Sequence, residues 1–259
     1  MKPSVERVNV LGCMVSAINL DLAWEKVREA ITRKEKGYVC VTGVHGVIEA
    51  QSDAGFKDIL NRAFLVTPDG MPMSWMGWLQ GADQMDRVYG PDLMLMVCDR
   101  GRHEGVRHFL YGGNDGVAPK LAASLRKRFP GLEIAGTYSP PFRPLNEEEN
   151  EDLRVMVADV KPDVFWVGLS TPKQERFMAE NLERLDATLM FGVGAAFDFH
   201  AGLVPQAPRW IQRAGLEWFY RVVKEPKRLW KRYLTIVPAF LFRAFAQTVG
   251  LKRYPAPAE

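Results

Sequence analysis

The hydrophobic and polar positions of this chain alternate between two periods. Short apolar runs, expected to form buried strands, occupy residues 8–11, 38–42, 65–66, 108–111, 132–135, 163–167 and 188–191. Between them lie segments with apolar residues at every third or fourth position, expected to form helices, at residues 20–34, 47–50, 54–63, 93–100, 117–129, 146–160 and 176–185. This alternation predicts an α/β fold, with one parallel sheet covered by helices on both faces.

Each predicted strand after the first is followed by a loop that contains small or polar residues. In a doubly wound parallel sheet these loops share the carboxyl edge, where ligands bind. We therefore expect the following residues to converge on one crevice: Thr42, Asp69, Gly112, Gly113, Tyr138, Thr171, Gln174 and Asp198.

Residues 65–72 place a single carboxylate, Asp69, at the tip of a segment rich in helix and strand breakers. Pro68, Gly70 and Pro72 predict a fixed loop that is neither helix nor strand. Pro-Asp-Gly is also a common turn sequence, so Asp69 has two interpretations: a turn residue, or a general base at the ligand edge. The Trp- and Met-rich residues 72–79 that follow are expected to fill the core.

A glycine-rich run, residues 112–116, lies between a predicted strand and a predicted helix. This arrangement can present backbone N–H groups and a helix N-terminus to a diphosphate, although it matches neither GxGxxG nor a P-loop. The chain contains no Asp-x-Asp pair, which many nucleotide-sugar enzymes use to hold a metal on the diphosphate. Helix N-termini and basic side chains would then meet that charge; Arg87 is the main candidate, with a purely structural arginine as the alternative.

The chain changes character at Pro205. Residues 205–259 contain eleven Lys/Arg against three acids, a net charge of +8, so the rest carries −5 within the overall +3. Basic residues alternate with aromatic ones, and a mostly apolar stretch, residues 234–249, follows. We predict a catalytic, nucleotide-sugar-binding domain at 1–204 and a basic helical appendage at 205–259. The appendage suits an anionic membrane surface; packing against the main domain, an oligomer interface and nucleic-acid binding are the alternatives.

The cysteines (Cys13, Cys40 and Cys98) and the four histidines are scattered along the chain. They fit neither a disulfide framework nor a metal site, which predicts a reducing, cytosolic location and no metal or cofactor. The first residues are too polar for a signal peptide, and no run reaches the roughly 18 apolar residues of a membrane span.

Several motifs, taken together in their order and spacing, resemble the WecG/TagA/CpsF glycosyltransferase family over roughly residues 8–245. They are Val66-Thr67-Pro68-Asp69-Gly70, Arg87-x-x-Gly90-x-Asp92, Gly112-Gly113, Gly168-x-x-x-Pro172-x-x-Glu175 with Gln174, Gly192-x-Gly194-x-x-Phe197-Asp198, and in the tail Arg209 to Glu217-Trp218 and Pro226-x-Arg228-Leu229. The resemblance implies a Rossmann-like core and a metal-independent, inverting enzyme. Such an enzyme moves a sugar from a UDP donor to a polyprenyl-diphosphate-linked saccharide, as a peripheral protein at the cytoplasmic face of the inner membrane.

The resemblance also implies residue roles. Asp69 would be the base, and Thr42 and Gln174 would be catalytic. The expected substrate contacts are His45, Arg87, Gly112, Gly113, Tyr138, Gly168, Glu175, Gly194, Asp198, Arg213, Arg221 and Arg228.

The chain departs from the family pattern at one corner of the expected site. Many family members carry Asn just after the Thr, where this chain has Gly43-Val44-His45. We expect His45 to contact substrate there, with helix capping as the alternative. The donor sugar stays open among N-acetylmannosamine, a uronic acid and a neutral hexose.

Two other functions compete with this interpretation. An NAD-type oxidoreductase is disfavoured because no GxGxxG follows the first strand. The other alternative is a non-enzymatic nucleotide-binding protein of the membrane periphery. The expected partners are a UDP-sugar, the lipid-linked acceptor and, through residues 205–250, the membrane surface; a homo-oligomer stays open and nucleic acid is not expected.

Overall fold

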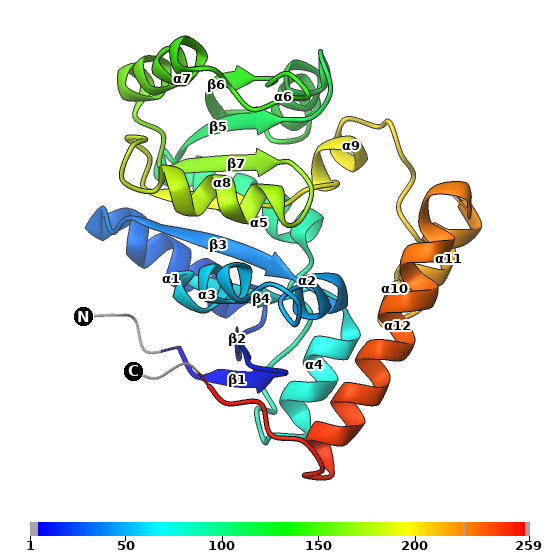
Figure 1. Ribbon diagram of the computed structural model, residues 1–259. Coiled ribbons are helices and arrows are strands. Elements are labelled where there is room, and N and C mark those ends of the chain that lie inside the picture. Colours follow the sequence, from blue (N-terminus) through cyan, green and yellow to red (C-terminus); the bar gives the residue numbers. More distant parts are fainter. Residues whose placement is uncertain (1–4, 225, 257–259) are drawn as a thin grey trace. The chain divides into compact units, whose positions relative to one another are not determined.

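A computed structural model describes residues 5–224 and 226–256, with the side chain of Arg228 also outside the description. The chain forms two compact units, each assembled from segments far apart in the sequence (Figure 1). The first unit contains the described residues of 1–20, 41–89 and 206–259, and the second contains residues 21–40 and 90–205. The boundary that we predict at residue 204 stays a prediction; here the C-terminal residues group with the N-terminal segment.

The strands of the main sheet follow the order β4-β3-β8-β7-β5-β6 among the described residues. Their bounds are β3 Gly37–Thr42, β4 Leu65–Pro68, β5 Arg107–Gly112, β6 Glu133–Tyr138, β7 Val164–Gly168 and β8 Leu189–Gly192. The pairs from β3 to β6 are parallel, with Val39 opposite Phe191, Phe191 opposite Trp166, and Trp166 opposite Leu110. These residues are fully buried, which explains why the strands are continuous apolar runs. The predicted α/β class with a parallel sheet flanked by helices is confirmed.

The helices of the second unit are α1 Leu20–Arg33, α5 Gly90–Gly101, α6 Val117–Arg128, α7 Glu147–Val160, α8 Lys173–Asn181 and α9 Ala196–His200, with a short 3-10 turn at Arg102–Glu104. Their apolar faces follow the predicted periodicity: in α1 the buried residues are Ala23, Trp24, Val27 and Ala30. Leu20 itself is counted with the first unit.

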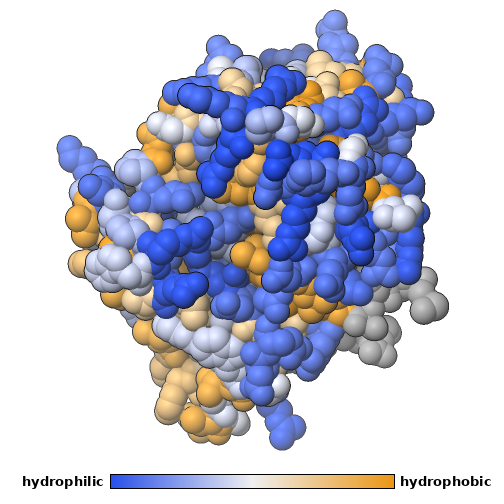
Figure 2. Space-filling model, turned by 180° about the vertical axis from the view of Figure 1, so that it is seen from behind, coloured by the Kyte–Doolittle hydropathy of each residue, from blue (hydrophilic) through white to orange (hydrophobic). Residues whose placement is uncertain are grey.

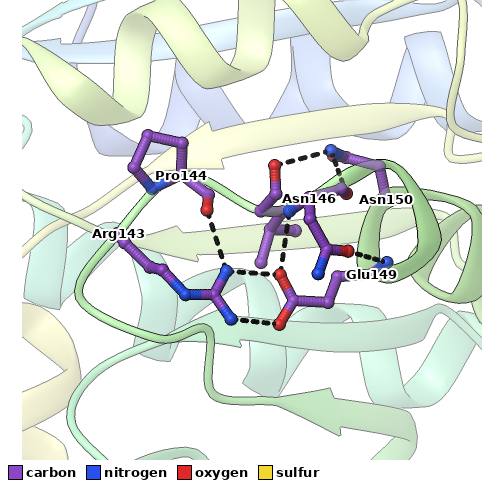
Figure 3. Close-up of polar contacts among 6 residues, drawn as sticks. Arg143, Pro144, Asn146, Glu149 and Asn150 are labelled. Carbon is purple, nitrogen blue, oxygen red and sulfur yellow. Dashed lines mark hydrogen bonds and ion pairs between the residues drawn. The ribbon is translucent and has the colours of Figure 1, made fainter.

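A capping box begins α7 (Figure 3). Asn146 Oδ1 accepts from the Glu149 amide at 2.8 Å, and Glu149 Oε2 accepts from the Asn146 amide at 2.9 Å. Arg143 donates to both carboxylate oxygens of Glu149 at 2.7 Å. The bond from Arg143, and then that from the Asn146 amide, lower the pKa of Glu149 to about 2. The acidic run that predicts a helix here therefore starts it through local hydrogen bonds.

The first unit contains a β-hairpin, of which the sequence predicts only one strand, at residues 8–11. β1 (Arg7–Val10) pairs antiparallel with β2 (Cys13–Ser16) through a turn at Leu11 and Gly12, both with positive φ. The other elements are α2 Val44–Glu49, α3 Ala54–Arg62, α4 Met71–Trp78, α10 Arg209–Arg213, α11 Glu217–Lys224 and α12 Pro226–Thr248.

The C-terminal helix is bound to this hairpin. Gln247 of α12 donates to Asn9 O at 2.7 Å and accepts from the Leu11 amide at 2.9 Å, and Asn9 donates to Tyr254 O at 2.7 Å. The helix continues through Pro238. Within residues 5–224 and 226–256, no helix combines the length and the apolar character needed to cross a membrane.

The loop expected at residues 68–72 is shorter than predicted. Pro68 ends β4 and Pro72 lies in the first turn of α4, where proline is tolerated because those N–H groups have no helical partner. Within α4 the three methionines are buried as expected. Trp75 and Trp78, however, are 41% and 42% exposed, so the prediction that this segment fills the core is wrong for the tryptophans.

Candidate functional site

In the first unit, Asp69 lies at a corner made by the ends of β3 and β4. Its amide donates to Thr42 O at 3.0 Å, and the Thr42 side chain is buried. A Cβ at Gly43 would lie 2.7 Å from Asp69 O and 3.5 Å from its Oδ2, so a side chain at position 43 would displace Asp69. Gly70 turns the chain with φ +93° before α4 begins. Asp69 is thus held by backbone contacts on both sides.

Beside this corner, Arg87 is committed to partners from the C-terminal helices. It donates to Gln212 Oε1 at 3.0 Å and to Glu217 Oε2 at 2.8 Å, and its guanidinium lies 3.9 Å from the centre of the Tyr89 ring. The Tyr89 hydroxyl donates to the other oxygen of Glu217 at 2.8 Å. Arg87, which we expected to bind a diphosphate, is therefore hydrogen-bonded within the protein. We call Arg87, Tyr89, Gln212 and Glu217 the clamp, because together they hold α10 and α11 against the segment after β4.

The clamp places Arg221, one helical turn after Glu217, in the field of Asp69. Burial tends to lower the pKa of Arg221. Electrostatic interactions with Tyr233, Tyr89, Glu217 and Asp69 outweigh the effect of burial, so the pKa of Arg221 is raised. Burial, followed by Glu217 and Asp69, raises the pKa of Tyr89. The corner therefore brings together a carboxylate from β4, a neutral phenol and a guanidinium from α11.

His45, in the first turn of α2, contacts Arg232 of α12 through its Nδ1 atom. Burial, and then the charges of Arg232 and Arg221, lower the pKa of His45 to about 4. The imidazole is therefore neutral at physiological pH. This places His45 beside the basic C-terminal helices, in the same unit as Asp69 and Arg221.

In the second unit, glycines allow three loops to approach one another closely. A Cβ at Gly112, where φ is +131°, would lie 2.7 Å from the Gly168 backbone, and the Gly113 amide donates to Gly168 O at 3.1 Å. A Cβ at Gly168 would in turn lie 2.5 Å from the Phe197 ring. The backbone at the carboxyl ends of β5 and β7 is therefore packed without side chains, next to the turn that starts α6 at Val117.

Gln174 and Glu175 lie behind a second glycine turn. The Gln174 carboxamide would meet a Cβ at Gly192 at 3.0 Å and one at Gly194 at 3.5 Å. Gln174 and Thr171 both donate to Glu175 Oε1, at 3.0 Å and 2.9 Å. Both residues of the Gln174–Glu175 pair are buried, so the structure places them behind the loop backbone.

The comparisons with known proteins decide the family. Residues 8–254 match the family described as "Glycosyl transferase WecG/TagA/CpsF family". The chain belongs to this family. It is 29% identical over 209 residues to the N-acetylglucosaminyldiphosphoundecaprenol N-acetyl-beta-D-mannosaminyltransferase of Bacillus subtilis, covering 80% of this chain and 79% of that protein. It is 30% identical over 204 residues to the protein of the same name from Bacillus spizizenii, covering 78% and 77%.

Membership of the WecG/TagA/CpsF family makes this chain a glycosyltransferase, in agreement with the resemblance and against the oxidoreductase and non-enzymatic alternatives. The roles of individual residues stay predictions. The structure brings Thr42, His45, Asp69, Arg87 and Arg221 into the first unit. It places the other described candidates of the core, Gly112, Gly113, Tyr138, Gly168, Gln174, Glu175, Gly194 and Asp198, in the second.

Four candidates lie toward the ends of elements or in the tail. Tyr138, the last residue of β6, stacks on Tyr111 with ring centres 5.8 Å apart, and Asp198 lies in the first turn of α9. Arg213 is exposed at the end of α10, and Arg228 lies in α12 with its side chain outside the described structure. Among the described residues, no three His, Cys, Asp or Glu side chains gather as a metal ion would require.

Sequence reasoning missed Tyr89, Gln212, Glu217 and Arg232. Tyr89 and Glu217 lie inside motifs that carry the resemblance, but nothing local says that a tyrosine and a glutamate more than a hundred positions apart share a hydrogen bond. Gln212 and Arg232 become visible only once α10 and α12 are placed against Arg87 and His45.

Proposed function

We propose that this family member transfers a sugar, with inversion and without a metal, from a UDP donor to a polyprenyl-diphosphate-linked saccharide. The work would take place on the cytoplasmic face of the inner membrane, for cell-surface polysaccharide synthesis. The observation that carries the proposal is the corner of the first unit. There the Asp69 amide is hydrogen-bonded to the Thr42 backbone, and the Asp69 carboxylate interacts electrostatically with Arg221. The names of the two relatives support the acceptor class, since both specify a sugar on diphosphoundecaprenol.

Asp69 acts as the general base. It takes the proton of the acceptor hydroxyl while that oxygen forms a bond to the anomeric carbon, and the bond from this carbon to the diphosphate oxygen breaks, so that UDP leaves with the electron pair. A single displacement converts an α-linked donor into a β product, and β is the linkage in the relatives' names. Asp69 is rigidly supported by backbone on both sides, as a group that must meet one hydroxyl requires.

A cationic group of the first unit is available for the diphosphate charge. Arg221 offers a partly buried guanidinium one turn beyond the clamp, and bidentate binding of phosphate is the geometry that guanidinium favours. In the second unit, the tightly packed turns at Gly112–Gly113 and Gly168 allow a nucleotide to approach the backbone. We propose that these turns hold the donor nucleotide.

The surface of the first unit suits a lipid-linked acceptor. Helices α10 to α12 expose large apolar side chains together with lysines; the apolar ones include Trp210, Phe219, Leu234, Phe242 and Phe245. Figure 2 shows hydrophilic residues over most of one face of the molecule, with hydrophobic ones scattered among them and a further group at the lower end of the view. Apolar and cationic side chains on the same helices favour the boundary of an anionic bilayer.

The proposal is tested by donor screening with the full chain and a short polyprenyl-diphosphate-linked N-acetylglucosamine as acceptor. UDP-N-acetylmannosamine is the first donor to try, and UDP release is the readout. Asp69→Asn keeps the shape and removes the base, so turnover should fall by about 10² to 10⁴-fold while the unfolding temperature stays near that of the native protein.

The matched control is Asp83→Asn, which changes an exposed carboxylate of the same unit and should leave turnover unchanged. Near-native turnover in Asp69→Asn would remove Asp69 as base. Absence of UDP release from every UDP-sugar, with native protein, would remove the proposed reaction.

A further inference from the structure

The loop after β7 and the first turn of α8 carry a polar cluster in the second unit. Its members are Thr171, Gln174 and Glu175, and the last two are 3% and 1% exposed. One oxygen of Glu175, Oε1, accepts from both neighbours: from the Thr171 hydroxyl at 2.9 Å and from Gln174 Nε2 at 3.0 Å. The carboxyl group thus fixes which way the Gln174 carboxamide points.

The fixed carboxamide is pressed against the turn that follows β8. A Cβ at Gly192 would lie 3.0 Å from Gln174 Nε2, and one at Gly194 would lie 3.5 Å from Gln174 Oε1 and 3.2 Å from Leu169 O. Gly194 also adopts φ +48°. The turn between β8 and α9 therefore follows the surface of the Gln174 side chain, and a change in that side chain must move the turn.

The surroundings of Glu175 fit a buried hydrogen-bonding role. Its second oxygen, Oε2, is buried with no hydrogen-bond partner in the described part of the chain. Burial raises the pKa of Glu175, and the bonds from Gln174 and Thr171 only partly oppose this effect. Oε1 can accept both bonds in either charge state of the carboxyl, because a carbonyl oxygen and a carboxylate oxygen are both acceptors.

We propose that Glu175 is a positioning residue of the glycosyltransferase reaction. It acts through Gln174: its carboxyl holds the carboxamide behind Gly192–Gly194, and the carboxamide sets the backbone of that turn for the donor nucleotide-sugar. Glu175 itself touches no substrate, in contrast with the binding role that the family resemblance implies. This inference rests on the proposed function, because it assumes that the second unit binds the donor.

Four variants and one control separate positioning from mere support of the fold. Glu175→Gln keeps an amide oxygen where Oε1 lies, so it should retain most of the native donor KM, within about threefold. Glu175→Leu removes the acceptor, and the loss of two buried hydrogen bonds should raise the donor KM by about tenfold, with the acceptor KM unchanged. Glu180→Leu makes the same kind of change at an exposed position of α8 and should behave as the native enzyme.

Gln174→Leu should reproduce the effect of Glu175→Leu, and the double variant should be no worse than Gln174→Leu alone, because both act through one carboxamide. Circular dichroism and thermal unfolding show whether each variant folds. If Glu175→Leu folds poorly, the comparison of Glu175→Gln with Gln174→Leu still decides the matter.

Equal donor KM values for folded Glu175→Leu and the native enzyme would overturn the proposal. So would a Glu175→Gln enzyme with a donor KM raised as far as that of Gln174→Leu, or strictly additive effects in the double variant. Failure of the native enzyme to release UDP from any donor would instead overturn the proposed function, so the two failures are distinguishable.

Discussion

The ion pair between Arg87 and Glu217 gives a prediction whose size follows from the structure. The two side chains are 8% and 19% exposed, and their nearest atoms lie 2.8 Å apart. Removing one partner of a buried pair leaves an uncompensated charge or acceptor and costs about 3 to 5 kcal/mol. Glu217 is partly exposed, and without Glu217 the Arg87 guanidinium still contacts Gln212 and the Tyr89 ring. We therefore expect Glu217→Ala and Arg87→Met each to lower the stability of the clamp by about 3 kcal/mol.

Removing both partners leaves no stranded charge. The double variant should therefore lose about 4 kcal/mol rather than the sum of the single losses, a coupling energy of about 2 kcal/mol. Because the chain forms two compact units, a single global unfolding energy is a poor measure. Hydrogen exchange of the α11 amides, compared across the four proteins of the cycle, measures the opening energy at the clamp itself.

The matched control is the exposed i, i+3 pair Glu151 and Arg154 of α7, where the same cycle should give a coupling energy too small to measure, because solvent screens the pair. A coupling energy for Arg87 and Glu217 as small as that of the control pair would refute the reasoning. It would mean that the clamp does not hold α11, and that the placement of Arg221 beside Asp69 has another cause.

Two further predictions concern acid stability and the membrane. Because the folded state lowers the pKa of His45 to about 4, the stability that its neutral form contributes is present above pH 6.5 and lost as the pH falls toward 4. His45→Gln should therefore narrow the difference between urea midpoints at pH 7 and pH 5, and an unchanged difference would contradict this assignment. Lys227→Gln with Lys231→Gln should weaken binding to vesicles containing anionic lipid by roughly 10- to 30-fold, at about 1 kcal/mol for each exposed cation. Equal weakening by the control pair Lys120→Gln with Lys127→Gln, exposed on α6, would show that overall charge is responsible.

Most elements of the fold follow from local pattern. The strand Val164–Gly168 is visible as a continuous apolar run, which is buried from Val164 to Val167, and the helix Leu20–Arg33 is visible because its buried residues recur at helical spacing. The hairpin is the main miss, since the turn at Leu11 and Gly12 depends on positive φ at a leucine, which sequence rules do not anticipate. Pro72 predicts a loop, yet it lies in the first turn of α4, where its missing N–H has no helical partner to lose.

Some residues of the candidate site could likewise be proposed from the sequence, and others could not. Asp69 and Thr42 could be proposed because Thr42 ends a predicted strand and Asp69 lies in the loop after another, and the structure joins them through one backbone hydrogen bond. The partners of Arg87 could not be proposed from the sequence. The residues next to an arginine in the sequence are the same whether its guanidinium faces solvent, a phosphate or Glu217. Which of these partners Arg87 contacts depends on where α11 lies.

The order of short apolar strands and amphipathic helices, the breaker-rich loops at the strand ends and the family motifs are local properties, and they sufficed for the α/β class and the glycosyltransferase family. The grouping of residues 206–259 with residues 1–20 and 41–89, the clamp around Arg87 and the burial of Glu175 behind the glycine turn depend on contacts between distant segments. Hydrogen bonds and buried charges gain their energy only from the atoms that packing places beside them, and a linear pattern does not specify those neighbours.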